Sequence, residues 1–507
     1  MKYRWLLLAL ILIGSLRIAA TWQHFSATVD EPSHLGCGME WWAEHKYTLE
    51  YHHAPLARIA MAFGPYMAGA RSNGSQNTDE AGNAVLHGQG HYWRNLTLAR
   101  AGILPFFWLA CWAIWSFGRR LYGEWTGLAG AGIFSMLPSV LGHSGLATTD
   151  MAAVATFAWT LDRLHDWYTA PSRWGLAWIG LAFGLAVAAK FSNLMFVGLV
   201  VAFFIVLYRR GWPLLLSGLL ALVVSSGTYR FVYDTRDIPI PQERPQEPLM
   251  NLVRPCVRVP FLGPIIRGVL EVQEHNKNGH MSQLMGKVNQ FGDWRFFPVV
   301  FAVKTPLAVL ALFFLGWRRR TWVPIALAML LLASILPVRI NLGVRHAMHV
   351  YVPLSVVAGW SLVHLARWLT VPLAAWLIVA SALVHPNYIA SFNEAARPDP
   401  AWFVADSDLD WGQDLPALVR LMDRRGISTC RLAYFGTAQQ HRLYPGRFTD
   451  GIPDPVPSRG CVAVSIHKLE PRARQLMQNG DGDPWSWVRQ VPELERAGRS
   501  IVVFMVP

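Results

Sequence analysis

Two adjacent carboxylates, Asp30 and Glu31, follow the first apolar run of the chain, residues 6–20. Acidic side chains at a membrane surface are costly unless they are solvated, paired or functional. The low dielectric near a bilayer raises the pKa of a carboxylate, which makes the group a more effective base at neutral pH. The pair therefore predicts general-base chemistry beside a membrane, and an ordinary acidic start to a loop is the alternative.

A second polar cluster in the same region contains Glu50, His52 and His53. Glutamate and histidine are suitable ligands for a divalent metal, so the three residues are candidate ligands, with an ordinary polar surface as the alternative. His53 and the earlier His34 are also candidate contacts for an acceptor substrate. The apolar stretch that follows contains Gly64 and Pro65 and is too short to span a bilayer, so we expect it to lie along the membrane surface.

A lone carboxylate, Asp150, lies at the expected outer end of an apolar run. Aspartate is favoured near the N-terminus of a helix, where its charge complements the helix dipole. Asp150 is therefore either a helix-capping residue, a second acid in the same site as Asp30, or both.

Four basic residues interrupt or flank later apolar runs: Lys190, Lys304, Arg345 and His346. Cations at the outer membrane face suit a phosphate or diphosphate group, and arginine can bind such a group with two parallel hydrogen bonds. These residues are candidate phosphate ligands. Contacts with lipid headgroups are the alternative reading, particularly for Lys190 and Arg345.

The last quarter of the chain begins with an acidic segment in which Asp406, Asp408, Asp410 and Asp414 surround Trp411. The carboxylates could bind a cation or a sugar, and the indole offers a stacking surface; Asp410 and Trp411 are candidate acceptor contacts. Alternatively, the acidic residues cap a helix that runs to about residue 425.

Three apolar strands are predicted near 430–435, 461–466 and 500–505, so this region reads as a small α/β domain. Cys430 and Cys461 stand at the starts of the first two strands. An oxidising exterior would allow a disulfide between them, and the spacing leaves both the bridged and the free forms open.

These candidate residues are separated by a series of apolar runs that must position them. The chain is 53% hydrophobic and 15% charged, whereas soluble domains carry roughly 25% charged residues. We predict an α-helical polytopic membrane protein with about eleven spans, near 6–20, 98–117, 125–142, 146–163, 174–189, 192–208, 212–228, 297–316, 322–337, 346–366 and 370–385. The expected domains are a membrane domain, 1–386, with long loops 22–96 and 229–296, and a water-facing domain, 387–507.

The net charge of +13 is better explained by basic residues between membrane spans than by nucleic-acid binding. Every second break between runs is short and carries arginine, as the positive-inside rule requires of cytoplasmic loops. This register places the N-terminus inside and the C-terminal domain outside, with nearly all unusual polar residues on the outer face. The first run also resembles a signal peptide, but the many later spans favour a retained signal-anchor.

The ordered motifs resemble those of a known enzyme group. They are Asp30-Glu31, Pro55-Leu56, Thr148-Thr149-Asp150, Lys304-Thr305-Pro306, Gly343-Val344-Arg345-His346 and Ser407-Asp408-Leu409-Asp410-Trp411-Gly412-Gln413-Asp414. Together they are similar to those of the GT-C glycosyltransferases of the protein O-mannosyltransferase and aminoarabinose-transferase type (glycosyltransferase family 39-like), in a bacterial branch with an appended extracytoplasmic domain. The likeness extends over nearly the whole chain.

The resemblance implies transfer of a sugar from a polyprenyl-phosphate donor to an acceptor outside the cytoplasm, with inversion of the anomeric centre. It implies that Asp30 is the general base, with Glu31 beside it and Asp150 as a second acid in the cavity. Arg345, together with His346, Lys304 or Lys190, would hold the donor phosphate.

Two positions depart from the pattern of this group. The usual Glu-His-Pro-Pro-Leu appears as His52-His53-Ala54-Pro55-Leu56, and Asp408 replaces a usual asparagine. The first departure leaves the metal or phosphate role of that loop open.

We therefore predict a multi-pass glycosyltransferase of the bacterial inner membrane. Its partners are a polyprenyl-phosphate sugar and a protein, lipid or polysaccharide acceptor, without nucleic acid. A divalent cation is a possible cofactor. A transporter or flippase of a lipid-linked or small solute is the main alternative, and a sugar-polymer ligase or polymerase is a third. The sugar and the acceptor are not specified by the sequence.

Overall fold

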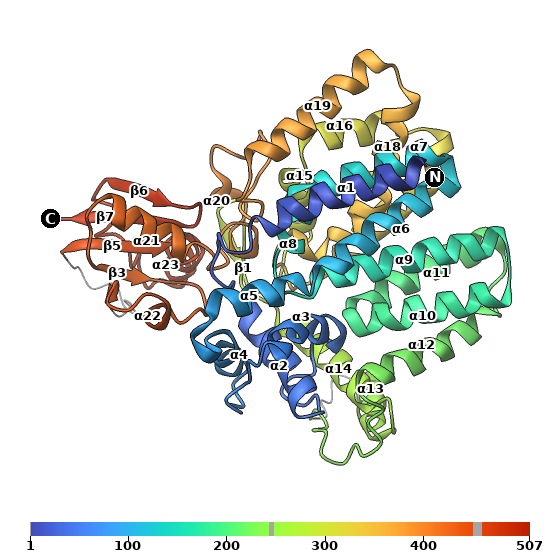
Figure 1. Cartoon of the computed structure of the whole chain (residues 1–507), viewed down its shortest axis with the longest axis horizontal. Coiled ribbons are helices and arrows are strands. Elements are labelled where there is room, and N and C mark those ends of the chain that lie inside the picture. The colour runs from blue at the N-terminus through green and yellow to red at the C-terminus, as the bar shows by residue number, and fades with distance from the viewer. Residues whose placement is uncertain (1, 243–247, 450–458) are drawn as a thin grey trace.

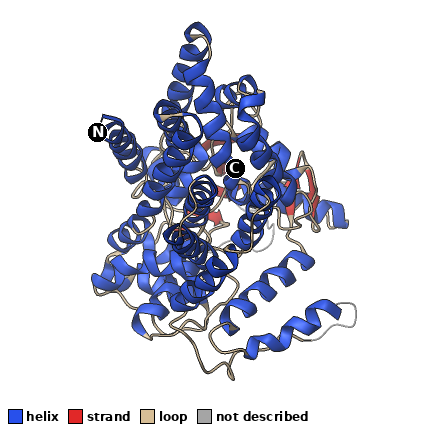
Figure 2. Cartoon of the chain, turned by 90° about the vertical axis from the view of Figure 1, so that its right-hand side faces the viewer, coloured by secondary structure: helices blue, strands red, loops and turns tan. Residues whose placement is uncertain are grey.

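The computed structural model describes residues 2–242, 248–449 and 459–507, and it contains a large helical part and a smaller part built on a sheet. Figure 1 shows the sheet at one end of the long axis and the hairpin of helices α10 (Arg173–Ala189) and α11 (Ser192–Tyr208) at the other. Figure 2 views the molecule from the helical end, where helices dominate the picture. The predicted combination of a helical region with a C-terminal α/β region is therefore present.

The helical part follows the predicted apolar runs. Its long helices are α1 (Lys2–Ala19), α5 (Tyr92–Ala101), α6 (Leu104–Tyr122), α7 (Glu124–Met136), α8 (Pro138–Ser144), α9 (Asp150–Thr169), α10, α11, α12 (Leu214–Thr228), α15 (Phe296–Lys304), α16 (Leu307–Leu315), α17 (Trp322–Ile335), α18 (Tyr351–His364) and α19 (Arg367–Leu383). Large apolar side chains point outward on several of them, including Leu8, Val206, Leu215 and Ile378. Exposed apolar surface of this extent is typical of contact with lipid.

Two of the predicted spans are broken rather than continuous. The run 125–142 bends by 68° between α7 and α8, and the run 297–316 bends by 106° between α15 and α16. A proline follows each break, and the residue before a proline is driven out of the helical conformation. Leu137 and Thr305 accordingly adopt extended backbones.

The number of spans is not confirmed. Among the described residues, one uninterrupted helical stretch, Tyr92–Tyr122, is long and apolar enough to cross a bilayer, and counting each bent pair as one span raises the number to three at most. Four further apolar helices, α10, α11, α12 and α19, are 10–17 residues long, shorter than the ~20 residues that a perpendicular span needs.

The two long loops contain structure of their own. The first holds α2 (Glu31–Ala43), α3 (Pro55–Met67) and α4 (Thr78–Leu86), and the second holds α13 (Pro248–Val253), α14 (Gly263–Asn278) and the hairpin of β1 (Ser282–Leu284) with β2 (Lys287–Asn289). Helix α3 coincides with the apolar stretch that was expected at the membrane surface. Figure 1 shows α2, α3, α4 and α14 grouped below the main bundle.

Within the described residues, the C-terminal sheet has five strands in the order β4-β3-β5-β7-β6. They are β3 (Cys430–Ala433), β4 (Phe448–Thr449), β5 (Gly460–Ser465), β6 (Glu493–Ala497) and β7 (Ile501–Val506), accompanied by helices α20 (Pro400–Phe403), α21 (Leu415–Arg424), α22 (Gln440–Leu443) and α23 (Ala473–Asn479). The three predicted strands are β3, β5 and β7. The short strand β4 and the polar edge strand β6 lacked an apolar pattern and were missed.

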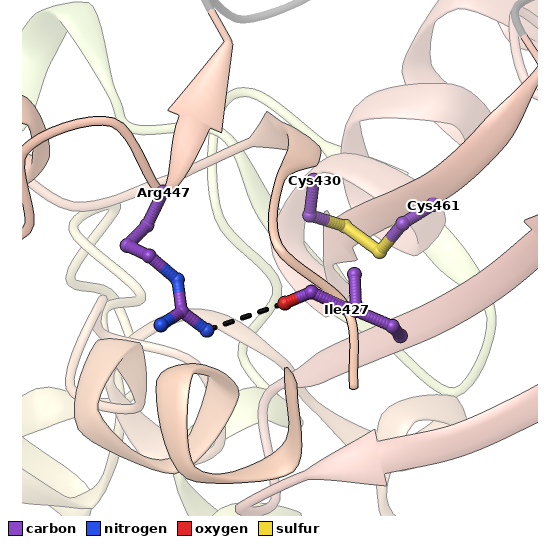
Figure 3. The surroundings of a disulfide bond; sticks show 4 residues. All are labelled: Ile427, Cys430, Arg447 and Cys461. Atoms are coloured by element: carbon purple, nitrogen blue, oxygen red, sulfur yellow. Dashed lines mark hydrogen bonds between the residues drawn. A yellow bond between two sulfur atoms is a disulfide. The ribbon is translucent and has the colours of Figure 1, made fainter. Parts of the chain in front are cut away.

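A disulfide joins neighbouring parallel strands of this sheet. Cys430 on β3 is bonded to Cys461 on β5, with 4.7 Å between the Cα atoms. Figure 3 shows the bond beside Ile427, whose carbonyl oxygen accepts a hydrogen bond from the Arg447 guanidinium at 3.3 Å. The bridged alternative is therefore the one that the structure contains.

Candidate active site

A cavity of about 600 Å³ lies where the first loop, the second loop and the bundle meet. Its lining combines polar residues with apolar residues, and many of the apolar ones come from the start of α11 and the end of α17, which form an apolar wall. The polar lining includes Asp30, His52, His53, Thr149, Lys190, His275, Asn276, His280, Arg345 and His346; the apolar lining includes Phe191, Leu194, Met195, Phe196, Ile335, Val338 and Ile340.

The central contact of the polar side joins the beginning of the chain to its last third. A guanidinium nitrogen of Arg345 lies 2.7 Å from Oδ2 of Asp30. Asp30 immediately precedes α2, and its side chain makes no capping bond to that helix. The carboxylate is therefore directed into the cavity, with its Arg345 partner beside it.

A second ion pair lies next to the first. Nζ of Lys190 lies 2.6 Å from Oδ1 of Asp150, and Arg345 approaches Oδ2 of the same carboxylate at 4.0 Å. Asp150 occupies the first turn of α9 but does not cap it. Two carboxylates and two cations thus form one nearly neutral cluster.

Lys304, another predicted phosphate ligand, is placed away from the cavity. Its amine is buried and donates hydrogen bonds to the carbonyl oxygens of Ile389 at 2.6 Å and Asp408 at 2.7 Å. It also lies over the ring of Phe392. Lys304 therefore connects the bundle to the segment that leads into the C-terminal domain. The other predicted phosphate ligand, His346, does line the cavity, beside Arg345.

Glu31 points away from the cavity although it is adjacent to Asp30. Its carboxylate receives two hydrogen bonds from Arg100, at 2.8 Å each, and one from the backbone of Ala147 at 2.8 Å. Burial raises the pKa of Glu31, but the Arg100 guanidinium outweighs this effect and the net shift of the pKa is downward. Glu31 thereby ties the Asp30 segment to the loop that precedes Asp150.

We expect Glu31→Gln to destabilise the protein, because breaking a buried ion pair leaves an uncompensated guanidinium and typically costs about 3–5 kcal/mol. Thermal unfolding of the detergent-solubilised protein measures the effect. Glu44→Gln, which breaks an exposed ion pair with Lys46, is the control and should leave the unfolding temperature nearly unchanged. An unaltered unfolding temperature for Glu31→Gln would remove Glu31 from this structural role.

Glu50 is the centre of the histidine cluster. One of its oxygens lies 2.6 Å from Nδ1 of His53, 3.2 Å from Nδ1 of His52 and 2.8 Å from the buried guanidinium of Arg58. Burial, together with the neighbouring His52, lowers the pKa of His53 to about 3. His53 is therefore neutral at physiological pH, a state in which imidazole can accept a proton or bind a metal.

The ligand atoms of Glu50, His52 and His53 lie within 4.8 Å of one another, which fits the donor set of a divalent metal. Arg58 shares the same carboxylate oxygen, so its positive charge opposes a cation there. His34 lies behind this cluster: it is buried, and its Nδ1 accepts a hydrogen bond from Arg58 at 3.1 Å. The metal remains a prediction.

The acidic segment of the C-terminal domain is buried and bonded to backbone. Asp410 accepts hydrogen bonds from the amides of Gly412 at 3.1 Å and His467 at 2.9 Å. Asp414 precedes α21 without capping it, and instead accepts hydrogen bonds from the backbone of Ser500 and from its hydroxyl. Asp410 and Trp411 do not line the cavity, and Trp411 lies under the Arg345 guanidinium, 4.4 Å from its ring centre.

Burial raises the pKa of Asp410 to about 6, above its ordinary value, so the folded protein binds a proton more tightly than the unfolded chain. This group contributes stability that is fully present below about pH 4 and lost as the pH rises through about 6, amounting to up to about 3 kcal/mol. We expect Asp410→Asn to flatten the pH dependence of the unfolding temperature between pH 4 and 7. An identical pH profile in the variant and the wild type would contradict the raised pKa.

The second loop contributes residues to the cavity that were not predicted from the sequence. Helix α14 and the turn after it supply His275, Asn276 and His280 to the cavity wall. The rings of His52 and His275 lie 6.2 Å apart, and those of His275 and His280 lie 5.7 Å apart. The amphipathic pattern of 263–278 was the available signal for a helix, but nothing in it indicated which helix face meets the first loop.

Comparison with known proteins finds a family match over part of the sequence and a likeness in fold to solved structures. Residues 101–229 match the family model described as dolichyl-phosphate-mannose-protein mannosyltransferase. No curated protein matches the sequence.

Two structures of ArnT from Cupriavidus metallidurans share the fold over nearly the whole chain. The form bound to undecaprenyl phosphate aligns with a TM-score of 0.53 and the apo form with 0.50. Both are 13% identical in sequence, and both alignments cover 98% of this chain and 97% of that chain. The predicted helical fold with a sheet at the C-terminus is thereby confirmed, whereas the predicted count of eleven spans is not.

Proposed function

We propose that the protein transfers a sugar from a polyprenyl-phosphate donor to an acceptor hydroxyl outside the cytoplasm. The observation that carries this proposal is the Asp30–Arg345 pair, which places a carboxylate and a guanidinium 2.7 Å apart in a cavity with one apolar wall. A carboxylate can remove a proton from an acceptor, and a guanidinium can stabilise a departing phosphate.

The apolar wall supports a lipid as the donor. Leu194 and Met195 at the start of α11 are more than a third exposed and continue directly from Lys190 into the cavity. A polyprenyl chain on this wall would bring its phosphate to Arg345 and Lys190. The related fold of ArnT bound to undecaprenyl phosphate supports the same class of lipid.

The reaction follows from these positions. Asp30 takes the proton of the acceptor hydroxyl, and the acceptor oxygen forms a bond to the anomeric carbon. The bond between that carbon and the phosphate oxygen breaks, and its electron pair leaves with the polyprenyl phosphate. Arg345 and Lys190 neutralise the negative charge that develops on the phosphate. One direct displacement of this kind inverts the anomeric centre.

In this account Asp150 holds Lys190 in place. The 2.6 Å contact fixes the amine at the cavity edge, where His346 provides a further contact for the donor. Arg345 must exchange part of its contact with Asp30 for a contact with the phosphate, so binding of the donor releases the base that the next step needs. Donor binding would therefore precede acceptor binding.

The proposed setting is the bacterial inner membrane, with the N-terminus in the cytoplasm and the C-terminal domain outside. The transferred sugar is a hexose or a pentose, and the acceptor is a protein, lipid or polysaccharide. The cavity lies between the first and second loops, both of which the arginine pattern places on the outer face.

The test is reconstitution in liposomes with a panel of undecaprenyl-phosphate sugars carrying a radiolabel in the sugar. We expect release of undecaprenyl phosphate together with a labelled product, and much slower release by Asp30→Asn. A flippase would instead move intact donor across the bilayer without cleaving it. Movement without cleavage for every donor would overturn the transferase proposal.

A further inference from the structure

We propose that the segment 407–413 is a positioning element that sets the separation of Asp30 and Arg345. The C-terminal domain thereby contributes to the geometry of the active site. The segment does not line the cavity, yet it contacts the backbone on both sides of the ion pair. This inference rests on the proposed function for its catalytic meaning, while the structural coupling that it asserts can be measured without turnover.

The backbone next to Asp30 is hydrogen-bonded to the segment 407–413. The amide of Val29, directly before Asp30, donates a hydrogen bond to the carbonyl oxygen of Trp411 at 3.0 Å. The amide of Ser26 donates to the carbonyl oxygen of Gln413, also at 3.0 Å. The hydroxyl of Thr437, which follows β3, donates to the carbonyl oxygen of Val29 at 2.7 Å. Both peptide groups of Val29 are thus held by the C-terminal domain.

The backbone next to Arg345 is hydrogen-bonded to the same segment. The amide of Val344, directly before Arg345, donates hydrogen bonds to the Asp408 carboxylate at 3.1 and 3.3 Å. The hydroxyl of Ser407 donates to the carbonyl oxygen of Leu342. The Arg345 guanidinium itself rests on the face of the buried Trp411 indole, an orientation that favours a cation.

A glycine between these contacts shows how closely the side chains of Ser407 and Asp408 approach the backbone before Arg345. Gly343 has a φ of +109°, and a Cβ atom there would lie 2.8 Å from the Asp408 carboxylate. Any other residue would be strained at this φ, and its Cβ would displace the side chains of Ser407 and Asp408. The close approach leaves little freedom for Arg345 to shift relative to Asp408.

The segment is in turn fixed by the sheet. Asp410 accepts a hydrogen bond from the amide of His467, which follows β5, and the hydroxyl of Tyr434, which follows β3, donates to the carbonyl oxygen of Gly412. Since β3 and β5 are neighbouring strands joined by the disulfide, both anchors belong to one rigid unit. A small misplacement of catalytic groups can lower a rate by about 100-fold. A rigid segment 407–413 would prevent such a misplacement of Asp30 and Arg345.

Two pairs of variants test the inference. Trp411→Leu removes the aromatic surface under Arg345. Trp485→Leu is its control, because Trp485 is also buried in the C-terminal domain and its indole donates to the carbonyl oxygen of Lys468, away from the ion pair. Thr437→Val removes the hydroxyl that holds Val29, and Thr437→Ser retains a hydroxyl at the same position. Neither Trp411 nor Thr437 lines the cavity.

The first readout is hydrogen–deuterium exchange in peptides covering residues 22–35 and 338–350, which needs no donor and no turnover. We expect Trp411→Leu to accelerate exchange in both peptides and Thr437→Val to accelerate it in the first. Thr437→Ser should restore slow exchange, and Trp485→Leu should leave both peptides protected. Unchanged exchange in Trp411→Leu and Thr437→Val would overturn the positioning role, whether or not the protein proves to be a transferase.

The second readout is turnover with the donor that the wild type uses. We expect kcat to fall by about 10- to 100-fold in Trp411→Leu and less in Thr437→Val, with recovery in Thr437→Ser. Trp485→Leu should retain the wild-type kcat despite a comparable loss of thermal stability. Equal kcat values for Trp411→Leu and Trp485→Leu would assign Trp411 to stability alone, whereas a wild type inactive with every donor would count against the proposed function and not against the exchange result.

Discussion

Asp30→Asn is expected to lower the rate of sugar transfer by about 10²- to 10⁴-fold, the range that removal of a general base usually produces. The amide cannot accept the acceptor proton, but it has nearly the same shape and can still contact Arg345, which lies 2.7 Å away. We therefore expect the variant to fold normally and to bind donor at least as tightly as the wild type. Single-turnover transfer with saturating donor measures the chemical step directly.

Glu44→Gln serves as the matched control for Asp30→Asn, because it also neutralises a carboxylate of the first loop but does so on the exposed surface. Its transfer rate should equal that of the wild type. A wild-type rate in Asp30→Asn would remove Asp30 from the mechanism and direct attention to Asp150 as the base.

The second large effect is expected at Arg345. Arg345→Ala removes the cation that faces the donor phosphate, together with its contacts to Asp30 and Asp150. We expect donor affinity to fall by more than 10-fold, and kcat/KM to fall further because the departing phosphate also loses its stabilisation. Binding of undecaprenyl phosphate to the protein in lipid nanodiscs separates the affinity from the rate.

Arg345→Lys keeps the positive charge but loses the planar, two-point contact, so its donor affinity should lie between those of the wild type and Arg345→Ala. Arg339→Ala removes an exposed arginine from the same loop and should change neither quantity. Equal donor affinity in Arg345→Ala and Arg339→Ala would contradict the phosphate role.

The sequence predicted the apolar helices and the strands with strong patterns because burial in a bundle or a sheet imposes a fixed spacing of apolar residues. It did not predict the breaks before Pro138 and Pro306, although a proline is itself a helix-breaking signal. The edge strand β6 was missed because its residues are polar and partly exposed, so it lacks the apolar alternation of a central strand.

For the site, shared position on the outer face was enough to expect that Asp30, Asp150, Lys190 and Arg345 converge, and the structure brings their side chains together. Shared position on the outer face did not predict that two adjacent residues would point in different directions. Asp30 enters the cavity while Glu31, one residue later, turns toward Arg100, because a helix begins between them and directs successive side chains about 100° apart.

Contacts between distant segments could not be predicted at all. Arg345 rests on Trp411 and Lys304 donates to the carbonyl of Asp408, and no spacing in the chain relates these residues. Both contacts arise because the bundle and the sheet pack against each other around the acidic segment. The acidic pattern suggested ligand binding, whereas the buried carboxylates accept hydrogen bonds from backbone amides.

The central claim is that the cavity between Asp30, Arg345 and the start of α11 is the site of a polyprenyl-phosphate donor. A cryo-EM structure of the protein with undecaprenyl phosphate in nanodiscs tests it directly. We expect the phosphate within hydrogen-bonding distance of Arg345 and Lys190, and the lipid chain along Leu194, Met195 and Ile335. A phosphate bound elsewhere, with Asp30 and Arg345 still paired and the cavity empty, would contradict the account.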